Sequence, residues 1–267
     1  MPALASLEKD TYGDHGVDED NNGGHEPIRE ENIYGTDESG FFPEGGIRVR
    51  VIGARGKKTQ HQQSDGGREN TTVIVTICTD GSSLKPAVIY KGQSYHVKLG
   101  YSKKGWTDGE IGVEYIKDFH DQTKAKAEGH TRLLLVDGHN SHYTLGFLLF
   151  TRNHRIHVLC YPSHATHVYQ GLDVVIFGPL KLFWTQEKDK WLCEKRTKVD
   201  KTNFLRIYGA AHSHVLTLEN IRAAFRRTGT WPFDRSVVTT EMMAPSLETS
   251  CQGYLPVQPT TPVRAVT

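Results

Sequence analysis

The feature that most constrains the fold of this chain is an uninterrupted segment rich in β-branched residues, TTVIVTICT at residues 71–79. Side chains branched at Cβ favour extended backbone, so this segment predicts a strand. Asp80-Gly81, a dipeptide typical of tight turns, follows it, and residues 84–91 (LKPAVIYK) supply a second strand-like segment. The sequence therefore predicts two adjacent antiparallel strands.

Helix-like segments follow this hairpin. Residues 109–127 place apolar side chains three and four apart after a Thr107-Asp108 cap, a spacing typical of an amphipathic helix. The other predicted elements are strands at 131–136 and 156–161 and helices at 144–154, 172–192, 201–215 and 218–228, the last capped by Thr217 or its neighbour. This order predicts an α/β fold with a mixed sheet and a helical C-terminal part.

The two ends of the chain differ in composition from its middle. Residues 1–31 are acidic and rich in Gly and Asn, and the chain from Pro245 onward is rich in proline without a long apolar stretch. Neither segment can bury enough apolar surface to offset the entropy lost on ordering. We therefore expect a disordered acidic leader at 1–31, a folded domain at 32–240 and an irregular tail at 241–267.

Charge is unevenly distributed along the chain. Residues 1–32 hold nine acids against Lys9 and Arg29, a net charge of −7, whereas the remainder holds 30 basic and 22 acidic residues, a net charge of +8. A basic body modestly favours a polyanionic partner such as nucleic acid. No apolar run reaches the roughly 20 residues of a membrane span, no secretory leader is recognisable and the four cysteines stand singly, so we expect a cytosolic or nuclear protein.

Two acidic residues follow strand-like segments. Asp137 comes directly after LLLV, and Asp37 comes after NIYGT. The carboxyl ends of strands line the ligand crevice in α/β sheets, so acids at these positions are candidates for function. Asp137-Gly138 is equally typical of an ordinary turn, and position alone leaves the two interpretations of Asp137 open.

A third acid, Asp173, lies in the hydrophobic segment YQGLDVVIFGPLK. This segment should be buried on at least one side, where an acid is costly unless it is paired or bound to a cation. A helix cap would explain Asp173 without any function. Three carboxylates that converge on one point repel each other, and divalent metal is the simplest compensation.

Several blocks of the sequence resemble those of a known family. TDESGF at 36–41, LLLVDGHNSH at 133–142 and YPSHATHVYQGLDVVIFGPLK at 161–181 are similar, in order and spacing, to three signature blocks of the pogo-like DDE transposases. This group includes the Tigger and Jerky relatives and the domesticated centromere protein B. GRENTTVIVTICTDG at 67–81 and GTWPFD at 229–234 resemble further blocks, so the similarity spans about residues 32–235.

The resemblance implies an RNase H-like mixed sheet flanked by helices, in which the central strand ends at Asp37, Asp137 lies on a neighbouring strand and Asp173 opens a helix. In that family the three acids are catalytic and bind two Mg²⁺ or Mn²⁺ ions. One ion activates the attacking water or 3′-hydroxyl, and the other stabilises the leaving oxygen of an in-line displacement. The implied protein is a nuclear DNA endonuclease or strand transferase of DNA transposition, with DNA as its partner, a homodimer as one arrangement, and no membrane or small-molecule cofactor.

The residues around these acids allow several interpretations. Asn140 and His142 would orient Asp137 or contact phosphate, whereas Glu38 is expected to have a structural role. Two His-x-x-His pairs, His139 with His142 and His164 with His167, raise a zinc site as a less favoured alternative. Gly171 stands where many relatives have Pro, which should alter the turn into the helix that carries Asp173.

Basic residues form a candidate nucleic-acid-binding groove: Arg48, Arg50, Arg55, Lys57 and Lys58 before the hairpin, and Lys181 after Asp173. A solvated strand edge protected by charge explains them equally well. The Arg226-Arg227 pair is expected on a solvated helix face. Too few residues precede Asp37 for the helix-turn-helix domains of complete relatives, so we expect this chain to lack sequence-specific recognition of transposon ends. A catalytically silent DNA-binding or interaction protein that retains the fold is the alternative to an active enzyme.

Overall fold

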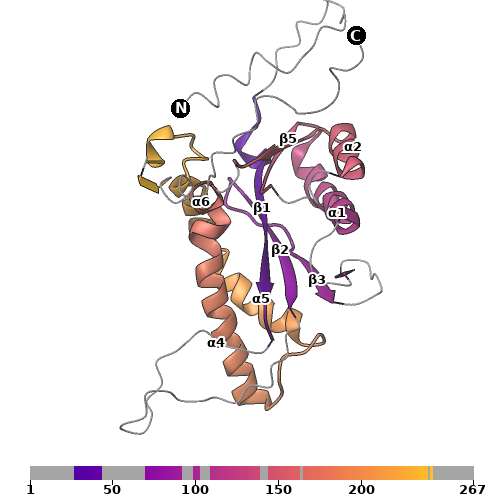
Figure 1. The fold of residues 1–267 in the computed structure, drawn as a ribbon, viewed down its shortest axis with the longest axis vertical. Coiled ribbons are helices and arrows are strands. Elements are labelled where there is room, and N and C mark those ends of the chain that lie inside the picture. The colour runs from indigo at the N-terminus through magenta and orange to yellow at the C-terminus, as the bar shows by residue number, and fades with distance from the viewer. Residues whose placement is uncertain are drawn as a thin grey trace, which may run out of the picture.

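The computed structural model describes residues 27–43, 70–91, 99–102, 109–138, 144–162, 165–239 and 241–242. Six strands and the helices that cover them make up this part of the chain (Figure 1). The strands are β1 (Ile33–Phe41), β2 (Thr71–Cys78), β3 (Ala87–Lys91), β4 (Leu99–Ser102), β5 (Arg132–Val136) and β6 (Ile156–Cys160). The helices are η1 (Glu30–Asn32), α1 (Gly109–Ala127), α2 (Leu145–Asn153), α3 (Thr166–Tyr169), η3 (Leu172–Ile176), α4 (Phe177–Lys195), α5 (Phe204–Val215), α6 (Leu218–Arg227) and η4 (Arg235–Val237).

The sheet is mixed, as predicted, with the strand order β4-β3-β2-β1-β5-β6. β2 pairs antiparallel with both β1 and β3, whereas β5 pairs parallel with both β1 and β6. The predicted hairpin is confirmed, and Gly81 occupies its turn with φ of +96°. β3 begins at Ala87 rather than residue 84, because Pro86 has no N–H to donate to a ladder.

Helices cover both faces of the sheet, giving three layers (Figure 1). On one face Tyr34, Ile74 and Leu134 pack against α1 and α2. On the other face Val75 and Leu135 pack against η3, α4, α5 and α6. Neighbouring residues of each strand thus serve opposite faces, as the alternation of side chains along a strand requires. Each layer removes apolar surface from water, and this burial drives the fold.

The predicted helices are found with adjusted ends. α1 has the predicted bounds, and the Thr217 hydroxyl caps α6 by accepting the backbone N–H of Asn220. α5 starts at Phe204 rather than residue 201, because Asp200 Oδ1 accepts the backbone N–H groups of Thr202 and Asn203 and fixes a turn there. In the described part of the chain, no helix combines the length and apolarity needed to cross a membrane.

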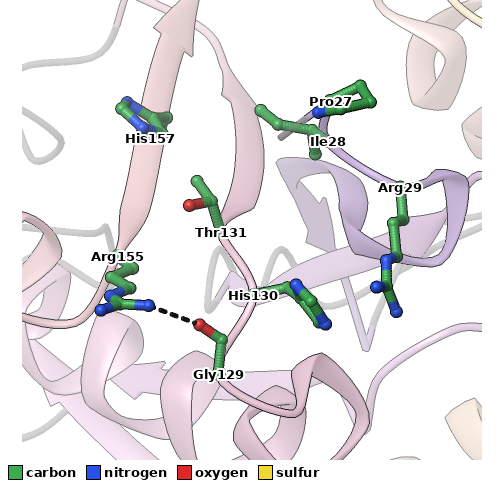
Figure 2. Close-up of a pocket in the computed structure, with 8 residues that line it drawn as sticks. All are labelled: Pro27, Ile28, Arg29, Gly129, His130, Thr131, Arg155 and His157. Atoms are coloured by element: carbon green, nitrogen blue, oxygen red, sulfur yellow. Dashed lines mark hydrogen bonds between the residues drawn. The ribbon is translucent and has the colours of Figure 1, made fainter. Parts of the chain in front are cut away.

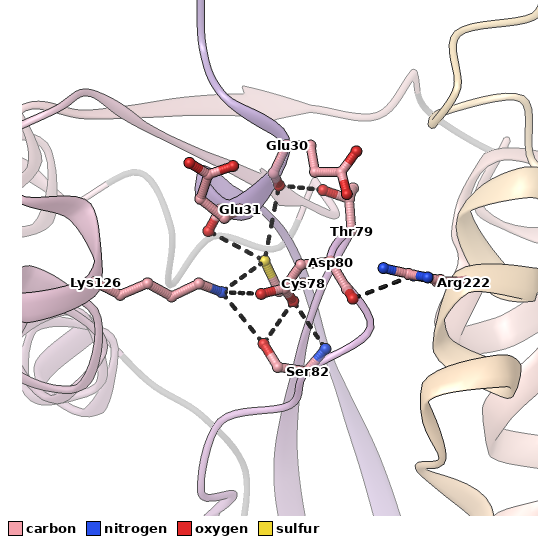
Figure 3. A network of polar contacts seen from close by, with 8 residues as sticks. All are labelled: Glu30, Glu31, Cys78, Thr79, Asp80, Ser82, Lys126 and Arg222. Carbon is pink, nitrogen blue, oxygen red and sulfur yellow. Dashed lines mark hydrogen bonds and ion pairs between the residues drawn. The ribbon is translucent and has the colours of Figure 1, made fainter.

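A polar network fastens the β2–β3 turn to its surroundings (Figure 3). The Asp80 carboxylate accepts hydrogen bonds from Ser82 and pairs with Lys126 Nζ of α1 at 2.5 Å. The backbone carbonyl of Asp80 accepts Arg222 Nε of α6 at 3.2 Å. Lys126 Nζ also donates to the buried Cys78 thiol at 3.4 Å. One turn therefore ties helices on both faces to the sheet.

Candidate active site

Asp37 lies within β1, and the expectation that the central strand ends there is wrong. The antiparallel ladder with β2 continues through the pair Asp37–Val75 as far as Phe41–Thr71. β2 is buried along its whole length and supplies a partner for every residue of this stretch, so β1 stays extended through Ser39 and Gly40 despite their low strand propensity. The parallel ladder with β5, by contrast, covers only Ile33 to Gly35.

Asp137 follows the last residue of β5, as predicted. The parallel register pairs Gly35 with Leu135, so Asp37 and Asp137 each lie two residues beyond the same rung of the ladder. Neighbouring strands are about 4.8 Å apart, which brings the two acids to the same level of adjacent chain segments. Alternation also directs Asp37 to the face of Val75 and Leu135, which η3 covers.

Asp173 lies in η3, a single π-helical segment that leads into α4. The N–H of Phe177 donates to the carbonyl of Leu172, five residues earlier, and π-type turns of this kind are frequent at functional sites. Leu172 and Ile176 are buried on the sheet, whereas Asp173 keeps part of its surface exposed although its carboxylate is partly withdrawn from water. The helix-cap explanation of Asp173 is wrong, because the N-cap position belongs to Gly171.

A close approach between η3 and α6 sets the position of Asp173. A Cβ added to Gly171 would lie 2.8 Å from the backbone oxygen of Ala224. Only glycine allows the two backbones to pack at this distance without a shift. Glycine at position 171 is therefore a packing requirement of this chain.

The three carboxylates influence one another electrostatically. Burial raises the pKa of Asp37 well above its usual range, the charges of Asp173 and Asp137 raise it further, and the Glu38 N–H, which donates to Asp37 Oδ1 at 2.7 Å, lowers it. Burial also raises the pKa of Asp173, with Lys181 opposing and Asp137 adding to the rise. The charges of Asp137 and Asp173 both act on Asp37, so these three acids, far apart in the sequence, lie near enough to influence one another.

Within the described ranges, no three His, Cys, Asp or Glu side chains already lie at the mutual distances of a metal-binding group. The three acids nevertheless offer carboxylate oxygens, which are the hard ligands that Mg²⁺ and Mn²⁺ prefer. Like charges at one site favour a bound cation, because the cation removes the repulsion that raises these pKa values. The residues fit a divalent metal in their chemistry and in their charge.

Tyr161 is a neighbour of Asp37 that sequence reasoning missed. It directly follows β6, and its hydroxyl lies 4.0 Å from the position that a Cβ on Gly35 would take. Burial and the charge of Asp37 both raise its pKa, which keeps the phenol protonated. Its position in the sequence could have indicated it, because Tyr161 follows the carboxyl end of the parallel strand β6, just as Asp137 follows the carboxyl end of the neighbouring strand β5.

The remaining candidates fall into two groups. Lys181 lies exposed on α4, and its charge stabilises ionised Asp173. His167 lies exposed on α3, with Nε2 3.2 Å from the Met242 carbonyl. The other predicted phosphate contacts, the predicted neighbours of Asp137 and the other zinc candidates lie outside the described residues: Arg48, Arg50, Arg55, Lys57, Lys58, His139, Asn140, His142 and His164.

Comparison with known proteins gives a family model, a curated relative and a similar structure. The model described as DDE superfamily endonuclease matches residues 68–225, a range that includes Asp137 and Asp173 and begins after Asp37. The relative is a protein of Cochliobolus lunatus named MFS-type transporter clz9, 32% identical over 229 residues. That match covers 80% of this chain and only 25% of the relative, so the chain spans about a quarter of the relative's length.

One similar structure is the Mos1 strand transfer complex, with a TM-score of 0.52 and 11% sequence identity. The match covers 78% of this chain and 54% of that chain. At this identity the likeness concerns the fold, and it agrees with the predicted RNase H-like arrangement of a mixed sheet between helices.

Proposed function

Since the chain belongs to the DDE superfamily endonucleases, we propose that it breaks and joins DNA strands, with Asp37, Asp137 and Asp173 as its catalytic and metal-binding residues. The observation that carries the proposal is the register that sets Asp37 and Asp137 two residues beyond the same rung, with the charge of Asp173 also acting on Asp37. A chain that bound no cation there would gain nothing from placing three repelling carboxylates together.

Two Mg²⁺ or Mn²⁺ ions, when bound by these acids, would activate the attacking hydroxyl and stabilise the leaving oxygen. The chain's own residues supply the setting. The Glu38 N–H holds one oxygen of Asp37, which leaves the other oxygen to bind metal. Lys181, close enough to stabilise ionised Asp173, would bind a phosphate of the substrate strand beside the reacting bond. No side-chain base is required.

The finer assignment is a pogo-like transposase domain. The blocks around the three acids support it, and the fold likeness to Mos1, whose structure is a strand transfer complex, supports the same reaction class. We propose DNA as the partner, the nucleus as the location and residues 32–240 as the catalytic unit, with the acidic leader and the tail outside it. A homodimer would bring two DNA ends together, and Asn140 and His142 would orient Asp137.

The test is nicking of supercoiled plasmid DNA by the purified chain with Mg²⁺ or Mn²⁺. We expect nicking by the wild type, and a fall to background in Asp137→Asn and Asp173→Asn. Asp189→Asn is the matched control, because Asp189 lies exposed on α4 about four helical turns beyond Asp173. Equal rates in the wild type and Asp137→Asn would exclude the enzyme and leave the silent DNA-binding protein.

Metal binding has a readout that does not depend on cleavage. Divalent metal should raise the unfolding temperature of the wild type, because a ligand that binds only the folded state stabilises it. The same ions should have little effect on Asp37→Asn. An equal rise in both proteins would place the metal elsewhere.

A further inference from the structure

A pocket of about 450 Å³ lies at the end of the sheet opposite the three acids. Thr131 precedes β5, Arg155 precedes β6, and Arg29 precedes η1, which leads into β1. The pocket is therefore lined by the segments that lead into the amino-terminal ends of three neighbouring strands (Figure 2). Its volume is in the range of about 300–1,000 Å³ that small-molecule groups occupy in proteins. The site is separate from the candidate active site.

The chemistry of the lining selects an anion. Two guanidinium groups, Arg29 and Arg155, and two imidazoles, His130 and His157, border the pocket together with the Thr131 hydroxyl. None of the described residues that line it is acidic. Guanidinium groups donate only, and their planar fork matches the oxygens of a phosphate.

The backbone holds Arg155 in place. Its φ is +52°, in the left-handed region that a non-glycine residue seldom adopts, and its carbonyl accepts the N–H of Arg132 at 3.0 Å. Arg155 Nη1 donates to the carbonyl of Gly129 at 3.1 Å (Figure 2). A guanidinium has five N–H donors, so this one contact fixes the side chain and still allows it to bind a ligand.

We propose that this pocket binds a backbone phosphate of the DNA on which the acids act, at a distance from the reacting bond. The proposal rests on the proposed function for the identity of the partner. Thr131 and Asp137 are six residues apart along β5, which at about 3.3 Å per residue is roughly 20 Å. At about 3.4 Å per nucleotide along a strand, this is a separation of about six nucleotides.

The surface between the two sites is open on β6. His157 and Leu159 alternate onto the sheet face that carries Asp37, and both are exposed, so no helix of the described ranges covers this strand there. A DNA strand that runs along β6 from the acids would therefore reach the pocket without displacing part of the described fold. The pocket would position the duplex, because phosphate contacts fix register without reading sequence.

The test measures DNA binding without cleavage. A fluorescent 30-base-pair duplex is titrated in EDTA at several KCl concentrations, using the whole chain and the double variant Arg29→Ala/Arg155→Ala. Each lost phosphate contact lowers the slope of log Kd against log salt by about 0.9, so we expect a fall of about 0.9 when the one phosphate held by both arginines is lost. Arg226→Ala/Arg227→Ala removes the same charge from an exposed stretch of α6 and should change the slope much less.

Three results would overturn the proposal. One is an equal slope change in both double variants. Another is an unchanged slope in Arg29→Gln, the single variant to use if the Arg155 change prevents folding. The third is a pocket that binds inorganic pyrophosphate, seen as a thermal shift lost in the variant, while DNA binding is unaltered. Nicking by Asp137→Asn at the wild-type rate would refute the proposed function alone, because the pocket is measured without metal.

Discussion

Replacing Asp80 with Asn should lower the free energy of unfolding at neutral pH by about 1–2 kcal/mol, and this difference should shrink in acid. Burial alone would raise the pKa of Asp80, but the hydrogen bonds from Lys126 and Ser82 outweigh burial and lower the pKa from 3.8 to about 2. A lowered pKa in the folded state means that ionised Asp80 stabilises the fold above about pH 4. The stabilisation is lost as the pH falls towards 2.

The magnitude follows from the size of this change. A fall of about 1.8 in pKa corresponds to roughly 2.4 kcal/mol, at about 1.36 kcal/mol for each pH unit. The side chains of Lys126 and Asp80 are 33% and 25% exposed, so solvent screens part of their attraction. We therefore expect about 1–2 kcal/mol at pH 7, and roughly half of it at pH 3, midway through the titration.

Urea unfolding of the wild type and Asp80→Asn at pH 7 and pH 3 measures both values. Asp121→Asn is the matched control, because Asp121 pairs with Lys124 at 2.6 Å while their side chains are 65% and 56% exposed. A pair this exposed should contribute little at either pH. Equal destabilisation by the two substitutions, or an Asp80 effect that does not shrink in acid, would refute the argument from burial.

Three further substitutions and one control test the site and the contacts that support it. Asp37→Asn should raise the metal-free unfolding temperature at pH 7, because it removes a buried carboxylate whose raised pKa destabilises the ionised fold; the gain should vanish at a pH low enough to protonate Asp37. Gly171→Ala should lower the free energy of unfolding, measured in urea, by about 1–3 kcal/mol, because its new Cβ would contact the Ala224 carbonyl. Gly178→Ala is the control: nothing lies within 4 Å of its new Cβ, so it should stabilise α4 by about 0.5–1 kcal/mol. Thr217→Ala should cost about 1 kcal/mol by the same measurement, because the N–H of Asn220 loses its cap.

Local sequence patterns predicted most of the secondary structure. The β-branched run became β2, the apolar spacing of residues 109–127 became α1 with the same bounds, and Thr217 caps α6. In each case the signal lies within the segment that it describes, as backbone preference, side-chain periodicity or a cap. Errors arose at ends set by single residues, such as the missing N–H of Pro86 and the turn fixed by Asp200.

The features that the sequence did not predict depend on pairing between strands that lie far apart in the chain. Residues 38–40 have little preference for a strand, and β1 continues through them only because β2 lies alongside. The basic pocket escaped sequence reasoning for the same reason: Arg29, His130 and Arg155 belong to three segments, and only the parallel order of β1, β5 and β6 brings them together. The predicted convergence of the acids came from resemblance to a family, since no periodicity within the chain indicates it.

The positions of the three acids depend on two packing arrangements of different strength. Asp37 and Asp137 are set by the shared rung between Gly35 and Leu135, in the centre of the sheet, where slippage by one residue would turn every side chain to the other face. Asp173 is set only by η3, a short segment held between the sheet and α6 at Gly171. A mutation that shifts α6 should therefore move one acid relative to the other two while leaving the sheet intact. Loss of metal binding in a protein that still folds is the expected signature of such a change, and Gly171→Ala, with its cost of about 1–3 kcal/mol, is the variant in which to look for it.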